Sequence, residues 1–181
     1  MKKYILILAV CVFIISCNNN TYNNKIKSID SINTKIDTLC KNIISYKDID
    51  FSNRYNLMFG KINTFGKYIN NKNLNTNMVI KFNEYANLSK FYKHISNKKD
   101  DLLYNLTLSK QQLSYLKHDL QKNLINTDSA NVYFNTEKNI AEDLFKETNL
   151  FFTEITKNDT IFNLLNKKID FLIDSLQNSD K

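Results

Sequence analysis

The side chains that most often carry out catalysis are few in this chain of 181 residues, and they are not spaced to act together. The two histidines, His94 and His118, would lie about 240° apart around one continuous helix. No His-Glu-x-x-His, Glu-x-x-His or Cys-x-x-Cys sequence occurs, so the usual metal-site spacings are missing. Asp143 and Glu147 share one side of a helix but have no third ligand nearby in sequence, and we interpret them as solvent-exposed charges. We therefore expect no enzyme activity, no metal and no cofactor.

One stretch has the pattern of a binding surface for an anionic partner, KFYKHISNKK at residues 90–99. Lys90, His94 and Lys98 recur every four residues, so a helix here carries a basic stripe next to aromatic side chains. Lys93 and Lys99 lie beside that stripe. Such a surface fits an acidic protein, a sulfated glycan or lipid headgroups. The alternative is a solvated lysine face on a lysine-rich protein.

The N-terminus has the features of a bacterial secretion signal that ends at a cysteine. Lys2 and Lys3 precede twelve uncharged, mostly apolar residues, 4–15. As a helix these would reach about 18 Å, which is too short for the roughly 30 Å hydrocarbon core of a membrane. The sequence Ile-Ile-Ser-Cys then resembles a lipoprotein lipobox, in which Cys17 becomes the first mature residue and is acylated. The alternative is a cysteine that merely follows an anchor helix.

Acylation of Cys17 would make the lipid bilayer the first partner of the chain, because several acyl chains together anchor a protein stably. We predict a signal peptide at 1–16, an acylated cysteine with a short polar tether at 17–24, and a single helical domain at 25–181. Cleavage leaves 23 basic against 18 acidic side chains, and this net charge of +5 does not require nucleic acid. Cys40, the remaining thiol, is expected to be a small core or flanking residue.

Most of the mature chain shows the periodicity of helices. Apolar residues recur at alternating steps of three and four from Ile29 to Tyr46 and again from Phe51 to Ile69, with a break at 47–52. The chain has two glycines and no proline, and no segment alternates as a β-strand does. The predicted fold is all-α, an elongated antiparallel bundle of five or six helices with coiled-coil-like heptad seams.

Polar stretches predict where the later helices begin and end. Asparagine-rich residues 70–77 predict a loop, and Asp128 is the predicted N-cap of a helix that ends at a break at 157–159. Residues 78–126 form one helix or two, depending on whether the polar stretch 96–101 interrupts them. The last predicted helix, which follows the break at 157–159, has an apolar stripe broad enough to pack against at least two neighbouring helices. The predicted apolar stripes of these helices include Leu124, Val132, Ile140 and Leu164.

The sequence MKKYILILAVCVFIISCNNN is similar to the N-termini of helical surface lipoproteins of Borrelia-type spirochaetes. The richness of the remaining chain in Asn, Lys, Ile and Tyr fits the same group, and lipoproteins of low-GC Bacteroidetes share these features. The resemblance implies display at the outer membrane and binding of a host protein, such as a complement regulator or a matrix component. Our first hypothesis is therefore a surface binding module for a host protein or an anionic glycan. The alternative is a periplasmic structural or assembly lipoprotein that acts through helix–helix association.

Overall fold

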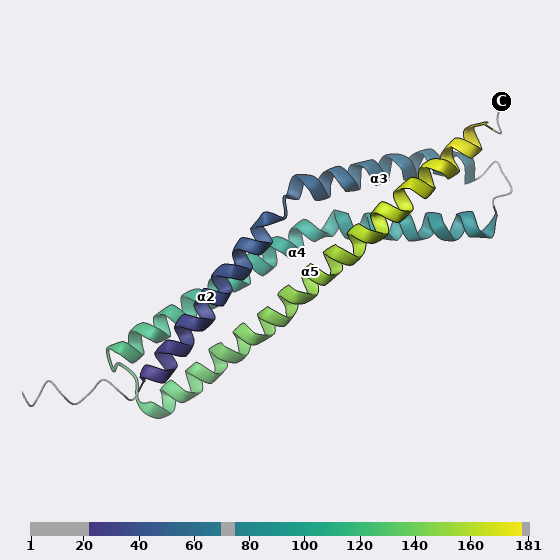
Figure 1. The fold of residues 1–181 in the computed structure, drawn as a ribbon. Coiled ribbons are helices and arrows are strands. Elements are labelled where there is room, and N and C mark those ends of the chain that lie inside the picture. Colours follow the sequence, from purple (N-terminus) through teal and green to yellow (C-terminus); the bar gives the residue numbers. More distant parts are fainter. Residues whose placement is uncertain (1–21, 70–74, 179–181) are drawn as a thin grey trace, which may run out of the picture. The chain divides into compact units, whose positions relative to one another are not determined.

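The computed structural model describes residues 22–69 and 75–178, which form four α-helices (Figure 1). Their bounds are α2 Asn23–Ser45, α3 Asp48–Ile69, α4 Thr76–Gln121 and α5 Thr127–Asn178. No strand occurs in these two ranges, so the predicted all-α helical bundle is confirmed. The predicted signal peptide and Cys17 lie outside the described residues.

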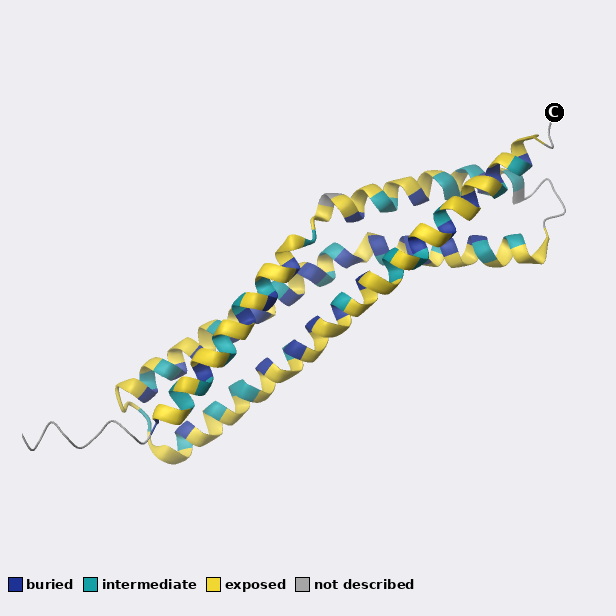
Figure 2. Ribbon diagram, viewed as in Figure 1, coloured by how far each residue is buried: buried dark blue, intermediate teal, exposed yellow. Residues whose placement is uncertain are grey.

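Tertiary contacts divide the chain into two compact units, where the sequence predicts one domain. Among the described residues, unit 1 contains 22–38 and 106–143, which are most of α2, the end of α4 and the start of α5. Unit 2 contains 39–105 and 144–178, and so includes all of α3. Figure 2 shows that buried residues recur along one side of each helix, as the heptad pattern predicts.

In unit 1, α2 lies antiparallel to α4. Asp30 forms an ion pair with Lys117, and Asp37 forms one with Lys110 at 2.5 Å, so residue numbers fall along α4 as they rise along α2. Apolar side chains from all three helical segments pack between these helices. The buried apolar residues of unit 1 include Ile29, Ile36, Leu106, Leu113, Leu116, Leu120, Ala130 and Ala141.

Unit 1 also includes the last part of the predicted tether. Tyr22 is buried, and its hydroxyl donates a hydrogen bond to the backbone carbonyl oxygen of Ile125 at 3.1 Å. Asn23 and Asn24 already belong to α2. Tyr22, Asn23 and Asn24 therefore belong to the folded part of unit 1, although the sequence prediction assigns them to the tether.

In unit 2, α4 runs antiparallel to α5. The hydroxyl of Tyr85 donates a hydrogen bond to Asn166 Oδ1 at 2.6 Å, and Lys98 pairs with Glu154 at 2.8 Å. Helix α3 packs against both helices, so three helical faces share one core. The most deeply buried apolar residues of this core include Met58, Phe65, Tyr85, Tyr92, Ile95, Leu102, Phe151, Ile155 and Ile169.

Helix α4 is not interrupted at 96–101, so residues 76–121 form one helix. The buried stripe continues through this stretch to Leu102, which is only 1% exposed. Lys99 is buried as well, and its ammonium group donates a hydrogen bond to the carbonyl oxygen of Tyr46 at 3.2 Å and pairs with Asp48 at 2.7 Å. Lys99 thus binds residues at the α2–α3 connection, and Lys98 pairs with Glu154 of α5, so this polar stretch is part of the helix and not a turn.

Helix α5 also continues through 157–159, where the sequence predicts a break. That prediction is wrong because Asp159 faces the bundle, where Arg54 and Tyr92 bind its carboxylate. Ile155, one turn earlier, is 1% exposed, so the apolar stripe is not broken either. The predicted five or six helices therefore reduce to four among the described residues.

The N-cap of α5 is Asn126 and not the predicted Asp128. The side-chain oxygen of Asn126 accepts a hydrogen bond from the backbone N–H of Ser129 at 2.8 Å, which satisfies a donor that the first helical turn leaves open. Just after α4, Asn123 has a φ of 52°, the left-handed conformation common at helix C-termini. Two asparagines thus shape the reversal from α4 to α5.

Helix α4 begins at Thr76, inside the predicted loop 70–77. Residues 70–74 of that loop lie outside the described residues. The side-chain oxygen of Asn75 accepts a hydrogen bond from the backbone N–H of Asn77 at 2.9 Å, as a residue before a helix does.

Three residues of the predicted apolar stripes are exposed in unit 1. Leu124, Val132 and Ile140 have 64%, 61% and 45% of their surface exposed, so their predicted burial is wrong. Helix α5 instead turns the small residues Ala130 and Ala141 toward the core, where both are fully buried. Small side chains let neighbouring backbones approach closely, which periodicity of large apolar residues does not reveal.

Candidate functional site

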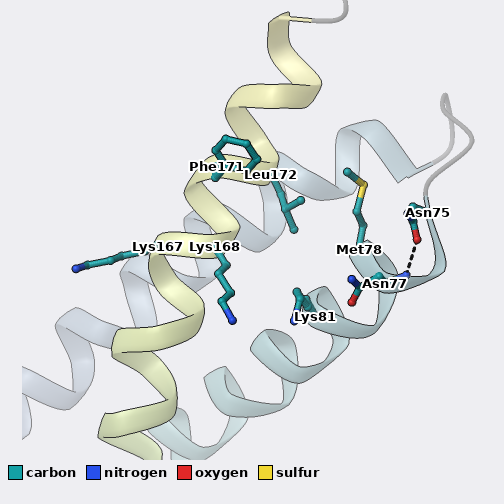
Figure 3. Close-up of a pocket in the computed structure, with 8 residues that line it drawn as sticks. All are labelled: Asn75, Asn77, Met78, Lys81, Lys167, Lys168, Phe171 and Leu172. Carbon is teal, nitrogen blue, oxygen red and sulfur yellow. Dashed lines mark hydrogen bonds between the residues drawn. The ribbon is translucent and has the colours of Figure 1, made fainter.

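An open groove lies between α4 and α5 in unit 2 and consists of two adjoining cavities, which share Lys81 and Lys168. Their volumes, about 420 and 550 Å³, lie in the range of ligand-binding pockets. The first cavity is also lined by Asn75, Asn77, Met78, Lys167, Phe171 and Leu172 (Figure 3). The second is also lined by Glu84, Asn87, Leu88, Phe91, Asn158, Ile161, Leu164 and Leu165. We call both cavities together the α4/α5 groove.

Helical periodicity produces the groove, because its lining residues recur every three or four positions along one side of each helix. They run from Asn75, just before α4, to Phe91 on α4 and from Asn158 to Leu172 on α5. Leu88 is 5% exposed and belongs to the floor. Leu164 and Phe171, in contrast, are 60% and 71% exposed and lie at the edge. The groove is therefore a largely apolar surface that residues 22–69 and 75–178 leave open.

Helix α3 covers a different side of α4 and α5. Its Phe65 stacks on Phe82 of α4 with ring centroids 4.3 Å apart, and its Lys61 donates a hydrogen bond to Asn166 Oδ1 at 2.8 Å. Neither Phe82 nor Asn166 lines the groove. The broad stripe of α5 thus packs against two neighbours, as predicted, while Leu164 at its margin stays exposed.

The groove has a basic rim formed by Lys81 and Lys168, and Lys167 is a further lining lysine. None of the three forms an ion pair with a carboxylate among residues 22–69 and 75–178. In Figure 3, Lys81 and Lys168 reach into the space between the helices, and Lys167 points to the other side of α5. Among the described lining residues, Glu84 is the one carboxylate. The rim is therefore a local excess of positive charge.

Some other lysines of unit 2 differ from those of the rim because they are paired within the bundle. Lys61 binds Asp170 at 2.5 Å, and Lys98 binds Glu154 at 2.8 Å. These pairs join one helix to the next, so their charges contribute to packing. The lysines of the groove rim have no such internal role.

The structure divides the predicted basic patch of α4. Lys90, Lys93 and His94 are exposed, and Lys90 lies 3.5 Å from the side-chain oxygen of the groove residue Asn87. Lys98 is paired with α5, as described above. Lys99, predicted to lie beside the basic stripe, is 6% exposed and faces the bundle, so it is not part of an exposed basic patch.

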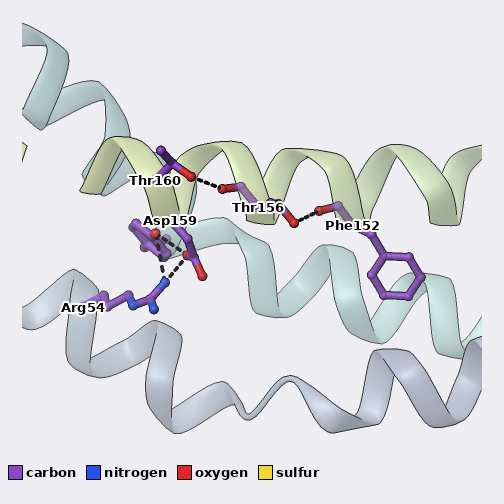
Figure 4. Close-up of polar contacts among 6 residues, drawn as sticks. Arg54, Phe152, Thr156, Asp159 and Thr160 are labelled. Atoms are coloured by element: carbon purple, nitrogen blue, oxygen red, sulfur yellow. Dashed lines mark hydrogen bonds and ion pairs between the residues drawn. The ribbon is translucent and has the colours of Figure 1, made fainter. Parts of the chain in front are cut away.

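A polar cluster joins all three helices of unit 2 beside the groove (Figure 4). Arg54 of α3 donates a hydrogen bond to the hydroxyl oxygen of Tyr92 at 3.1 Å and forms an ion pair with Asp159 of α5. Tyr92 in turn donates a hydrogen bond to Asp159 at 2.7 Å. The guanidinium carbon lies 5.3 Å from the ring centroid of Phe162. Burial, and then the hydrogen bond to the carboxylate, raise the pKa of Tyr92 above its ordinary value.

This cluster positions the groove instead of opening to it. Asp159 lies between two lining residues of α5, Asn158 and Ile161, so its fixed partners set the rotation of that helix. Arg54 is the only arginine of a chain with 24 lysines. Its planar group can bind a carboxylate and stack on a ring at once, which a lysine ammonium cannot do.

The other candidate residues considered for catalysis or metal binding lie on α2, α4 and α5. His94 and His118 are exposed at separate places along α4, and Asp143 and Glu147 are exposed on α5. Cys40 is half-buried and forms no disulfide. The part of the chain that the structure describes holds no group of three or more His, Cys, Asp or Glu side chains that could bind a metal ion.

No protein-family model, functionally described protein or solved structure matches this chain. Among residues 22–69 and 75–178, every helix lacks an apolar stretch long enough to span a lipid bilayer. The groove was missed by sequence reasoning, although the breadth of the apolar stripe on α5 was a signal for it.

Proposed function

We propose that this protein is a non-enzymatic binding module, held on the bacterial envelope by an acylated Cys17, and that the α4/α5 groove is its binding face. The observation that carries the proposal is the groove itself, with Leu164 and Phe171 exposed beside Lys81 and Lys168. A cluster of exposed apolar residues marks an interaction surface more often than single ones do. The basic rim adds a preference for an anionic partner.

The location follows from the N-terminal sequence. A positive start, a short apolar run and the Ile-Ser-Cys sequence together support export and acylation at Cys17. Each buried CH₂ of an acyl chain contributes about 0.8 kcal/mol, so more than one chain keeps the protein on a bilayer. Display at the outer surface, with a host protein as the partner, is the arrangement that the resemblance to spirochaetal lipoproteins favours.

Binding is tested by comparing variants in a pull-down from host serum. Leu164→Glu and Phe171→Glu place a carboxylate in the groove, and because both residues are more than half exposed, the fold is expected to tolerate them. Leu150→Glu is the matched control, since Leu150 lies on the same helix, is also 60% exposed and does not line the groove. Capture of a serum protein is expected to be lost in the groove variants and kept in the control. Capture that survives both groove variants would contradict the proposal.

Anchoring is tested separately. Radiolabelled palmitate is expected to label the wild-type protein and not Cys17→Ala, which is expected to leave the detergent phase. Protease treatment of intact cells then distinguishes the outer surface from the periplasm. Protection of the protein would favour the periplasmic structural role and contradict surface display.

A further inference from the structure

The shape of the α4/α5 groove points to the secondary structure of its occupant. Its lining on α4 extends from Met78 to Phe91, a distance of about 20 Å at 1.5 Å per residue. The groove lies between two antiparallel helices on a side that α3 does not cover. A further helix placed there would pack its apolar stripe into the groove, as helices do in four-helix bundles and in helix-in-groove recognition.

The charge of the rim specifies the occupant further. Lys81 and Lys168 reach into the groove and lack a carboxylate partner among the described residues, and Glu84 is the one carboxylate of the described lining. A second copy placed symmetrically would bring the same lysines together, because a two-fold interface repeats one surface on both sides. Like charges in such an interface repel. An anionic helix satisfies the rim, and a symmetric copy of this groove does not.

Exposure favours a helix over a single acyl chain. Leu164 is 60% exposed and Phe171 is 71% exposed, and both lie at the edge of an open groove. An acyl chain lying in the groove would leave its own outer side in water. A helix covers the edge residues with its apolar face and keeps a polar face toward solvent.

We infer that the α4/α5 groove of unit 2 binds an acidic amphipathic α-helix of a partner protein. The helix lies beside α4 and α5 as a fourth helix of unit 2. Its Leu- or Phe-type residues at three- and four-residue spacing contact the groove, and its flanking carboxylates pair with Lys81 and Lys168. This inference rests on the proposed function, because it names the chemistry of the partner that the groove binds.

The test uses the purified full-length protein and a fluorescent synthetic peptide. The probe has leucines at helical three- and four-residue spacing and glutamates beside them, and its anisotropy reports binding. A second peptide has lysines in place of the glutamates, and a third has the acidic composition in scrambled order without an apolar face. Laurate and vesicles of phosphatidylglycerol are tested as competitors, because both offer negative charge with acyl chains.

Charge reversal at the rim gives the decisive comparison. In Lys81→Glu/Lys168→Glu, affinity for the acidic peptide is expected to fall by at least about tenfold, and the lysine peptide is expected to become the better ligand. Lys93→Glu/Lys157→Glu makes the same change of charge at exposed lysines outside the groove and is expected to change affinity by less than about threefold. The milder variant Lys81→Gln/Lys168→Gln checks the result if the reversed variant unfolds.

Three results would overturn the inference. In the first, the scrambled peptide binds as tightly as the acidic peptide. In the second, the acidic peptide shows no saturable binding. In the third, laurate or vesicles displace the acidic peptide, and this displacement requires Lys81 and Lys168. If serum capture depends on Leu164 and Phe171 but the acidic peptide does not bind, the proposed function stands and this inference falls. If serum capture also fails to depend on them, both fall.

Discussion

Replacing Arg54 with lysine is expected to destabilise unit 2 although the positive charge is kept. Arg54 donates a hydrogen bond to Tyr92 at 3.1 Å, pairs with Asp159, and holds its guanidinium carbon 5.3 Å from the ring centroid of Phe162. Only a planar group with several N–H donors can make these contacts together. In a chain with 24 lysines and one arginine, this is the position where the two residues are least interchangeable.

The magnitude follows from the contacts that lysine cannot keep. A hydrogen bond that involves a charged group contributes about 1.5–3 kcal/mol, and the contact with the aromatic ring contributes about 0.5–1 kcal/mol. The side chains of Arg54 and Asp159 are 29% and 30% exposed, so solvent screens their pairing only in part. A lysine that keeps one contact with Asp159 recovers about 1 kcal/mol. The expected net loss is about 1–3 kcal/mol of the free energy of unfolding.

Urea unfolding followed by far-UV circular dichroism measures this loss, and hydrogen exchange of α3 assigns it to unit 2. Lys93→Arg is the control, because Lys93 is exposed and its replacement is expected to change the free energy of unfolding by less than about 0.5 kcal/mol. The double variant Arg54→Lys/Tyr92→Phe is expected to lose less than the sum of the two single losses, since the residues share a hydrogen bond. Stability of Arg54→Lys within about 0.5 kcal/mol of wild type, or strict additivity, would refute the reasoning.

Three further predictions concern pH, capping and a buried charge. The unfolded chain releases the Tyr92 proton near the ordinary pKa of 10.0, whereas the folded chain keeps it. The free energy of unfolding is therefore expected to fall as pH rises above that value. In urea titrations at alkaline pH, Tyr92→Phe is expected to make this fall smaller. Asn126→Ala is expected to lower the free energy of unfolding in urea by about 0.5–2 kcal/mol, and Asp128→Ala to lower it less. A larger loss for Asp128→Ala would exclude Asn126 as the N-cap. Lys99→Glu is expected to lower the free energy of unfolding by at least about 2 kcal/mol, because it buries an unpaired carboxylate. The control Lys93→Glu is expected to leave the thermal midpoint nearly unchanged. Equal midpoints of the two variants would contradict the burial of Lys99.

Periodicity predicts the helices of this protein well, because the property that it detects is the one that packs them. The first two seams contain Ile29, Ile36 and Ile43 on α2 and Met58 and Phe65 on α3, and all five side chains are completely buried. With almost no glycine or proline, little in the sequence competes with helix formation. The existence of these helices and the faces that they turn toward the core could therefore be predicted from local sequence alone.

The predicted break at 157–159 failed, and the choice between one helix and two at 96–101 could not be made from sequence, because both depend on partners distant in sequence. The polar stretch at 96–101 is compatible with a helix since Lys99 reaches Asp48, and the stretch at 157–159 is compatible with one since Arg54 binds Asp159. A run of polar residues is typical of a loop when water is its only partner. When another helix supplies the ion pair, the same residues favour a continuous helix.

The groove could be predicted only in part, because periodicity gives the width of an apolar stripe and not the side that neighbours leave uncovered. The stripe of the last helix predicts two neighbours, and α3 and α4 are those neighbours. That Leu164 stays exposed depends on where α3 packs, which is decided by contacts such as Phe65 on Phe82. Of the basic patch predicted at 90–99, Lys99 is buried, which periodicity alone could not show.

The balance of energies explains why apolar contact and charge must act together at the groove. Covering Leu164 and Phe171, which are mostly exposed, contributes about 1–2 kcal/mol each. Association costs at least about 4 kcal/mol in lost translational and rotational freedom. A partner that covers only these two residues therefore gains too little to bind, and it must also pair with Lys81 and Lys168. An apolar helix without carboxylates is for this reason expected to be a poor ligand, and this agrees with the proposal that Lys81 and Lys168 select an anionic partner.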